Sequence, residues 1–253
     1  MQFIRLVCLL TFLLLATNSW STSISICADE WYPINREKEE LPGYGLEIAR
    51  AVFAAHNIEI VYLQMPWKRA IEKAQSGECN AIIGAIKDEA PSLHFPAETI
   101  GFVDATFYIK KTNPWRYSGI ESLMQVRLGI IDNYFYEKKV NAYLAANPHS
   151  PNIAVSSSKE GVEGLLWRLM FGKIDVLIES SVVMQAKLKQ KNLQDTIIDA
   201  GQAGANEDIY LSFSPVSPSA KQWVEWFDAG VAELRKNGSL AKILQRYNLQ
   251  DWK

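Results

Sequence analysis

The order of apolar segments between residues 24 and 86 constrains the fold of this chain most strongly. Three short apolar runs, at 24–29, 58–63 and 80–86, alternate with segments of helical periodicity at 46–56 and 66–76. Strand, helix, strand, helix, strand in this order implies right-handed crossovers between neighbouring parallel strands. The first third of the chain is therefore predicted to form an α/β unit built on a parallel sheet.

A similar alternation begins again after Pro114, which interrupts a further predicted strand at 102–110. The predicted strands and helices then follow in the order 127–131, 136–146, 152–156, 159–171, 174–179, 182–190, 196–199, 210–213, 219–237 and 239–247. We predict two α/β lobes, each a mostly parallel sheet flanked by helices, with a helical tail. The extended stretches 107–112 and 208–213 are predicted to cross between the lobes and to act as a hinge.

The first 21 residues have the composition of a secretory signal peptide. One cation, Arg5, precedes an apolar run at 6–16, and small polar residues follow it. Eleven apolar residues are too few to span a bilayer, which needs about 20. We predict cleavage near Ser19 to Ser21 and an exported, soluble, periplasmic protein.

The balance of charges argues against a nucleic-acid partner, and the two remaining cysteines bear on a possible disulfide. The chain carries 26 Lys and Arg against 28 Asp and Glu, so no basic surface for nucleic acid is expected. Two cysteines, Cys27 and Cys79, follow the predicted signal peptide. In an oxidising compartment such a pair is consistent with one disulfide, and two buried thiols are the alternative.

Sequence motifs for metal, nucleotide or hydrolase chemistry are absent. His56, His94 and His149 are far apart and show no metal-ligand spacing. There is no Gly-x-Ser-x-Gly elbow and no P-loop, and Gly43-x-Gly45 does not directly follow a strand. We predict no metal, no cofactor and no catalysis.

The start of the helix after Pro66 departs from the usual charge pattern. Lys68 and Arg69 lie in its first turn, where positive charge opposes the helix dipole. Local rules are often broken at functional sites. Arg69 is therefore predicted to bind an anionic group of a ligand, although a solvated surface pair or a structural ion pair would also explain it.

Several segments resemble the family-3 extracellular solute-binding proteins, the amino-acid-type binding proteins of ABC transporters. They are Asp29-Glu30-Trp31-Tyr32-Pro33, Gly43-Tyr44-Gly45-Leu46-Glu47-Ile48, Pro66-Trp67-Lys68-Arg69-Ala70, Gly77-Glu78-Cys79-Asn80-Ala81, the run at 172–178 and the tail at 227–247. The resemblance implies the type II periplasmic-binding-protein fold, with lobe 1 at 22–110 plus 212–253 and lobe 2 at 111–211. It also implies delivery of a solute to an ABC permease.

The sequence departs from the amino-acid clamp of that family. The segment at 85–92 lacks the arginine that would bind a ligand carboxylate, and Ser180 occupies the place of the aspartate that would bind an amino group. Asn133-Tyr134-Phe135 replaces small hydroxyl residues. The solute is accordingly predicted only as small and polar, whether amino-acid-like or a carboxylate.

Aromatic and charged residues near predicted strand ends are the candidate ligand contacts, because open sheets bind ligands at the carboxyl ends of their strands. They are Asp29, Trp31, Tyr32, Trp67, Arg69, Lys87, Tyr134, Phe135 and Glu179. The favoured function is a monomeric periplasmic binding protein. The alternatives are a sensor for a membrane receptor and an exported, dehydratase-like enzyme that would use Glu179, Asp132 or Lys87.

Overall fold

The computed structural model describes residues 22–253, and the signal peptide predicted for residues 1–21 lies outside this range. Its elements follow the chain in the order β1 (Thr22–Ala28), α2 (Tyr44–Ala54), β2 (Ile58–Gln64), α3 (Trp67–Ser76), β3 (Ala81–Ala85), β4 (Gly101–Lys110), η1 (Ile120–Gln125), β5 (Leu128–Ile131), α4 (Lys138–Ala146), β6 (Ile153–Ser156), α5 (Gly161–Met170), β7 (Val176–Glu179), α6 (Ser181–Lys191), β8 (Ile197–Phe213), α7 (Ala220–Lys236) and α8 (Ser239–Gln245).

The strands form a mixed sheet in the order β2-β1-β3-β8-β4-β7-β5-β6. Strand β1 pairs in parallel with β2 and β3, and β5 pairs in parallel with β6 and β7. Every antiparallel pair among the described strands includes β4 or β8. The predicted α/β fold is confirmed, and its antiparallel part is confined to the two strands that run between the halves of the molecule.

Strand β8 is longer than the sequence predicted. The expectation of two separate strands at 196–199 and 210–213 was wrong, because residues 197–213 form one strand. Its first part pairs with β4, where Ile197 lies opposite Lys110, and its last residues pair with β3. The polar, glycine-containing middle of β8 extends because β4 supplies hydrogen-bond partners. The β4–β8 ladder changes register between Val103 and Ala105.

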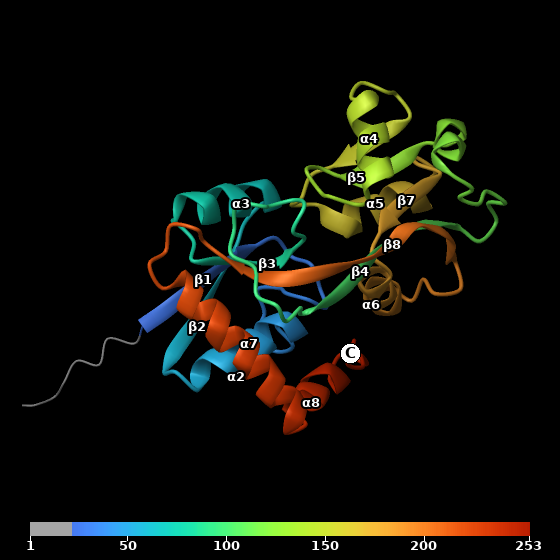
Figure 1. The fold of residues 1–253 in the computed structure, drawn as a ribbon. Coiled ribbons are helices and arrows are strands. Elements are labelled where there is room, and N and C mark those ends of the chain that lie inside the picture. The colour runs from blue at the N-terminus through green and yellow to red at the C-terminus, as the bar shows by residue number, and fades with distance from the viewer. Residues whose placement is uncertain (1–21) are drawn as a thin grey trace, which may run out of the picture.

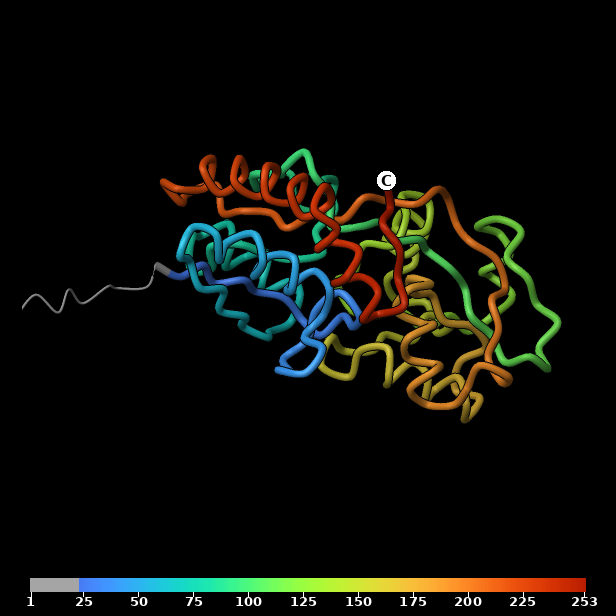
Figure 2. The backbone as a smooth tube through the Cα atoms, turned by 90° about the horizontal axis from the view of Figure 1, so that it is seen from below, coloured from blue at the N-terminus to red at the C-terminus, as the bar shows by residue number. Residues whose placement is uncertain are grey.

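Helices gather around the two ends of the sheet in two groups (Figure 1). We call β1–β3 with α2, α3, α7 and α8 lobe 1, and β5–β7 with η1, α4, α5 and α6 lobe 2. Strands β4 and β8 run between them. Figure 2 shows the blue and red ends of the described chain together in one half, and the green-to-orange middle in the other.

Aromatic packing joins the C-terminal helix α7 to lobe 1. Phe227 of α7 stacks with Phe53 of α2 at 6.5 Å between ring centroids, and both rings contact Phe213 of β8. All three side chains are fully buried. Burial of each such side chain contributes roughly 1.5–3 kcal/mol, so α7 is an integral part of the core of lobe 1.

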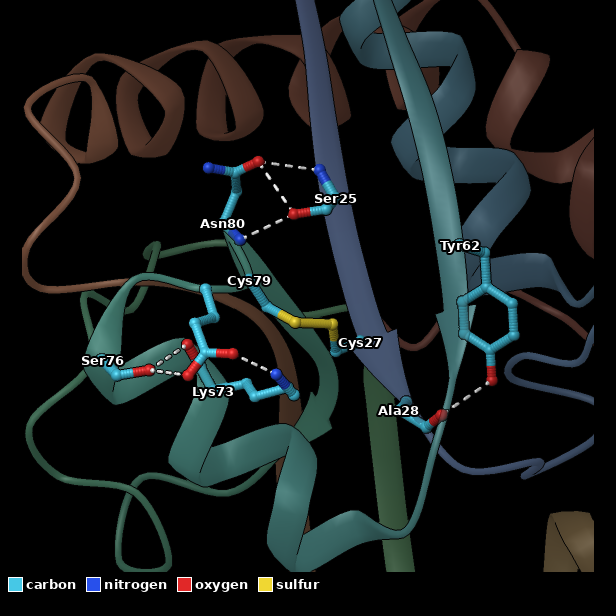
Figure 3. The surroundings of a disulfide bond; sticks show 9 residues. Ser25, Cys27, Ala28, Tyr62, Lys73, Ser76, Cys79 and Asn80 are labelled. Carbon is cyan, nitrogen blue, oxygen red and sulfur yellow. Dashed lines mark hydrogen bonds and ion pairs between the residues drawn. A yellow bond between two sulfur atoms is a disulfide. The ribbon is translucent and has the colours of Figure 1, made fainter.

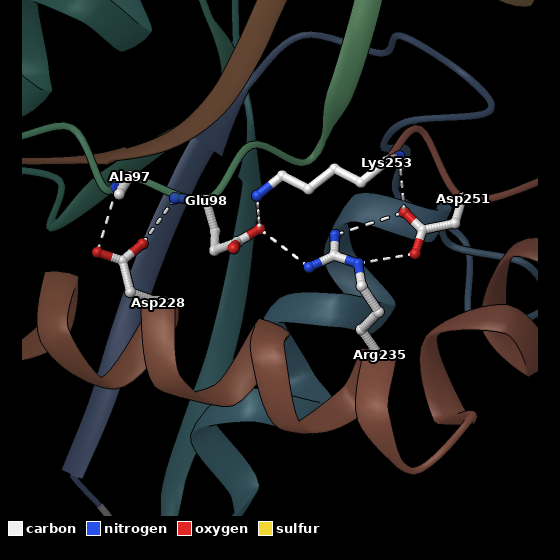
Figure 4. A network of polar contacts seen from close by, with 6 residues as sticks. All are labelled: Ala97, Glu98, Asp228, Arg235, Asp251 and Lys253. Atoms are coloured by element: carbon white, nitrogen blue, oxygen red, sulfur yellow. Dashed lines mark hydrogen bonds and ion pairs between the residues drawn. The ribbon is translucent and has the colours of Figure 1, made fainter.

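A polar network ties the end of the chain to the segment before β4 (Figure 4). Arg235 of α7 donates to Asp251 at 2.7 Å and to Glu98 at 3.1 Å. Lys253 donates to the same Glu98 carboxylate at 2.7 Å, and Asp228 accepts the backbone N–H of Glu98 at 2.7 Å. These contacts hold the C-terminal tail against lobe 1.

A disulfide joins Cys27 at the end of β1 to Cys79 after α3, with 6.2 Å between the Cα atoms (Figure 3). The sequence left this pair open between a disulfide and two free thiols. The side chain of Asn80 accepts from both the backbone N–H and the hydroxyl of Ser25, each at 2.9 Å. Together these links fix the β1–α3–β3 unit on which one wall of the site is built.

Candidate functional site

A narrow cavity lies between the two lobes, where β1 and β3 of lobe 1 face β7 of lobe 2. The space open to the centres of water-sized molecules is about 40 Å³. It is lined by Asp29, Trp31, Trp67, Ile83, Gly84, Ile86, Glu89, Val103, Asp104, Tyr134, Phe135, Tyr136, Glu179 and Ser180. At roughly 10–15 Å³ of such space per water, the cavity holds only a few water-sized groups. The lobes are therefore closed on each other.

Asp29 enters the cavity directly after β1 and is 6% exposed. Its carboxylate Oδ2 accepts a hydrogen bond of 2.6 Å from the hydroxyl of Tyr134 in lobe 2. Burial raises the pKa of Asp29 to about 7, and the hydrogen bond from Tyr134 partly opposes this shift. Asp29 is thus both a link between the lobes and a carboxyl group that titrates near neutral pH.

Glu179, the last residue of β7, forms the second link across the cavity. Its Oε1 accepts from the indole Nε1 of Trp31 at 3.1 Å and from the backbone N–H of Ser180 at 2.8 Å. Its Oε2 is buried and has no hydrogen-bond partner among the described residues. Burial raises the pKa of Glu179 to about 7, and the side chain is only 2% exposed.

A glycine allows the Trp31 ring to approach the sheet. Gly84 of β3 has φ +94°, and a Cβ at this position would lie 3.1 Å from Cε3 of Trp31. That distance is tighter than most Cβ contacts, and positive φ is unfavourable for other residues. The position of the indole in the cavity therefore depends on Gly84.

Trp67 begins α3 and is held by a third carboxylate. Its indole Nε1 donates a hydrogen bond of 2.5 Å to Glu89 Oε1, and the side chain is buried. Burial raises the pKa of Glu89 to about 7.

A fourth carboxylate, Asp104 of β4, accepts from the backbone N–H and the hydroxyl of Ser181 at 2.9 and 2.7 Å. Asp104 therefore occupies the N-terminus of α6.

Comparisons with known proteins show what the chain is similar to in sequence and in fold. The chain is 21% identical over 226 residues to the probable amino-acid-binding protein YxeM of Bacillus subtilis, covering 85% of this chain and 79% of that protein. The predicted resemblance to the family-3 extracellular solute-binding proteins is confirmed. No protein-family profile matches the sequence.

Solved structures show the same periplasmic-binding-protein fold. An ancestral arginine-binding protein with bound arginine superposes with a TM-score of 0.73 at 16% identity, covering 89% of this chain and 97% of that one. A histidine kinase sensor domain described as similar to periplasmic binding proteins also gives a TM-score of 0.73 at 16% identity, with 89% and 95% covered. At this level of identity the likeness concerns the fold.

Six of the nine residues predicted as ligand contacts lie together around the cavity. They are Asp29, Trp31, Trp67, Tyr134, Phe135 and Glu179. The remaining three do not line it, although Tyr32 borders an adjoining space of about 300 Å³ that Asp29 also lines. Tyr32 packs between Arg36, whose guanidinium lies 4.1 Å from the ring centroid, and Tyr247. The Lys87 ammonium lies 4.7 Å from the ring centroid of Tyr210.

Arg69, the predicted anion-binding residue, is exposed on α3. It lines an open groove with Lys68, Asp132 and Asn133 and does not line the closed cavity. The cations in the first turn of α3 thus face solvent near the edge of the lobes, while Trp67 of the same turn faces inward.

Four polar or acidic lining residues were not singled out from the sequence as ligand contacts: Glu89, Asp104, Tyr136 and Ser180. Ser180 had a signal, since it occupies the place of an aspartate of the family. Glu89 lies in the segment at 85–92, whose sequence signal was the absence of an arginine. Asp104 and Tyr136 had no local signal, because their exposure to the cavity depends on how the lobes close.

Within residues 22–253, no group of three or more His, Cys, Asp and Glu side chains is arranged to hold a metal ion. No helix in the same range is long and apolar enough to cross a membrane.

Proposed function

We propose that the protein is an exported solute-binding protein that encloses a small polar solute between its lobes. The observation that carries this proposal is the pair of hydrogen bonds across the cavity, Trp31–Glu179 and Tyr134–Asp29. Each one joins a residue just beyond β1 to a residue of lobe 2. In the proposed division of the whole chain, which also assigns β4 to lobe 1 and most of β8 to lobe 2, residues 22–110 and 212–253 form lobe 1 and residues 111–211 form lobe 2.

Opening and closing would occur about β4 and β8, which connect the lobes. Hinged closure of two domains around a ligand needs only a few such connecting residues. In the open form the carboxylates of the cavity are hydrated, and a solute that contacts both lobes favours the closed form. A solute larger than a few atoms must displace Trp31 or Tyr134 from the closed cavity, because only about 40 Å³ is free.

The proposed partner is the membrane subunit of an ABC importer, which would receive the solute from a monomeric binding protein. The name of the similar YxeM protein, a probable amino-acid-binding protein, supports amino-acid binding. The similar sensor domain of a histidine kinase supports the second candidate, a sensor that reports the closed form to a membrane receptor. The Cys27–Cys79 disulfide supports an oxidising compartment outside the cytoplasm.

Binding without catalysis is favoured over the dehydratase-like alternative. Of the residues considered for acid–base chemistry, Glu179 lines the cavity, but Asp132 and Lys87 do not. Asp132 is exposed in the open groove near Arg69, and Lys87 lies against Tyr210. A general acid and a general base within reach of one solute are therefore not assembled from these three residues.

The proposed function is tested by combining a binding screen with a measurement of shape. The purified chain, without residues 1–21, is screened by thermal shift against amino acids, amines, sugars and carboxylates. Each hit is then added during small-angle X-ray scattering, and the solute is recovered and analysed. We expect at least one solute to raise the melting temperature, to favour the compact form and to be recovered unchanged. Chemical conversion of the solute would indicate the enzyme instead.

A further inference from the structure

The cavity is strongly acidic. Asp29, Glu89, Asp104 and Glu179 line it, and none of its described lining residues is a lysine, arginine or histidine. Three of these carboxyl groups have a pKa raised to about 7, with burial as the largest cause in each case. Buried carboxylates that lack a cationic partner are costly. The site therefore gains most from a partner that brings positive charge.

Glu179 presents an unused acceptor to this cavity. Its Oε1 is occupied by Trp31 and Ser180, whereas its Oε2 is buried without a partner among the described residues. A buried polar atom without a hydrogen bond costs about 1–3 kcal/mol, and more if it is charged. A cationic N–H donor on a ligand would satisfy Oε2 and would neutralise the charge at the same time.

Aromatic rings form much of the remaining wall. Trp31, Trp67, Tyr134 and Phe135 all line the cavity. Ring faces attract ammonium and guanidinium groups, with about 0.5–2 kcal/mol gained per contact depending on how well water is excluded. Acidic groups and aromatic rings thus favour the same class of ligand.

A carboxylate on the ligand would meet no cationic side chain among the described lining residues of the cavity. The N-terminus of α6 is a site that could hold an anion, but Asp104 already accepts the N–H of Ser181 there at 2.9 Å. Arg69 and Lys87, the two cations predicted as ligand contacts, lie outside the cavity. A ligand carboxylate placed here would face four acidic side chains.

We propose that the ligand is a small organic cation without a carboxylate group, such as a primary amine or a guanidine. Its N–H groups donate to Glu179 Oε2 and to the Asp29 or Glu89 carboxylate, and its carbon chain lies against Trp31, Trp67 and Phe135. Because only about 40 Å³ is free in the closed cavity, Tyr134 moves away from Asp29 to make room for this ligand. This inference rests on the proposed solute-binding function and names the ligand class of that same cavity. It differs from amino-acid binding in requiring that no carboxylate be present.

Matched pairs that differ only by a carboxylate test this inference. Isothermal titration calorimetry on the purified chain would compare agmatine with arginine, cadaverine with lysine, and tyramine with tyrosine. We expect at least one decarboxylated compound to bind at least tenfold more tightly than its amino acid. A ratio below tenfold in every pair would overturn the inference.

The same titrations separate this inference from the proposed function. If an amino acid, sugar or carboxylate binds while the three amines do not, the cation inference fails and the solute-binding function stands. If no compound of any class binds, both fail. These two results are distinguishable within one screen.

A charge-removing variant tests where the cation binds. Glu179→Gln keeps the size of the side chain and should weaken the best amine at least tenfold. Glu59→Gln is the matched control, because Glu59 is exposed on β2 far from the cavity lining. Circular dichroism establishes that each variant is folded, and Glu89→Gln replaces Glu179→Gln if the latter is not. Equal affinity in the cavity variant and the control would overturn the assigned position.

Discussion

The hydroxyl of Tyr134 donates a hydrogen bond of 2.6 Å to Asp29 Oδ2 across a sequence separation of 105 residues. Asp29 directly follows β1 and Tyr134 lies in the loop after β5, so this bond joins the two lobes at the cavity. The Trp31–Glu179 bond runs beside it in the opposite sense, from a donor in lobe 1 to an acceptor in lobe 2. Both bonds join side chains of opposite lobes, so the closed shape is partly held by the protein's own side chains.

Replacement of Tyr134 by phenylalanine should favour the open form of the ligand-free protein. The change removes one hydrogen bond across the cavity, which contributes about 1 kcal/mol. We expect a larger radius of gyration by small-angle X-ray scattering than for the unchanged protein. Tyr143→Phe is the control, since that tyrosine lies on α4 outside the cavity. Identical scattering of Tyr134→Phe and the unchanged protein would contradict the prediction.

The stability of the ligand-free protein should fall as pH rises from about 4.5 to 7. Folding raises the pKa of Asp29 from 3.8, and of Glu89 and Glu179 from 4.5, to about 7. The folded protein therefore holds more protons than the unfolded chain in this range. Each group lowers the free energy of unfolding by up to about 1.4 kcal/mol per pH unit.

Melting temperatures between pH 4.5 and 8 would measure this effect. The triple variant Asp29→Asn, Glu89→Gln, Glu179→Gln should show a much weaker fall over the same range. Carboxyl groups whose pKa is lowered in the folded state, such as Asp175, reduce the free energy of unfolding only when the pH falls below this range. A triple variant with the same pH profile as the unchanged protein would show that these three groups are not responsible.

Gly84→Ala should disturb the cavity through Trp31. The added Cβ would lie 3.1 Å from the indole and would need φ near +94°. We expect a loss of stability of about 1–2 kcal/mol from the backbone, together with weaker solute binding and altered tryptophan fluorescence. Gly172→Ala is the matched control, because Gly172 has φ +64° and no atom within 4 Å of its added Cβ. Loss of binding in both variants would argue against a specific role of Gly84.

Removal of the disulfide should destabilise the protein without altering the cavity lining. Cys27 and Cys79 are 52 residues apart in sequence, and both are buried. Loss of a cross-link of this span costs about 2–4 kcal/mol, mainly through the larger freedom of the unfolded chain. Urea unfolding of the Cys27→Ala, Cys79→Ala double variant would measure it. An unchanged midpoint would show that the cross-link adds nothing to stability.

Replacement of Arg69 tests the sequence-based prediction of an anion contact. Arg69 is exposed in the groove beside Lys68 and does not line the cavity. We expect Arg69→Ala to leave solute affinity within about twofold, because a screened surface charge contributes little. Calorimetry against the best ligand of the screen provides the comparison. A loss of tenfold or more would restore Arg69 as a ligand contact.

The order and type of most elements followed from the sequence because their signals are local. The segment predicted as a strand at 58–63 is β2, Ile58–Gln64, and the helix predicted to begin after Pro66 is α3, Trp67–Ser76. In each case the spacing of apolar residues or a proline marks the element within a few residues. Parallel pairing in lobe 1 followed from the alternation of predicted strands and helices between residues 24 and 86.

Tertiary structure alone decided the middle of β8, the acidic character of the cavity and the contacts across it. Residues 200–207 belong to β8, where Gln202, Ala203 and Glu207 pair with β4, although their own pattern does not indicate a strand. Trp31 and Glu179 are 148 residues apart, and Glu89 was recognisable as a lining residue only once Trp67 was placed. Local periodicity determines which segments become strands and helices. The direction of a charged side chain depends on how two lobes, joined by β4 and β8, close on each other.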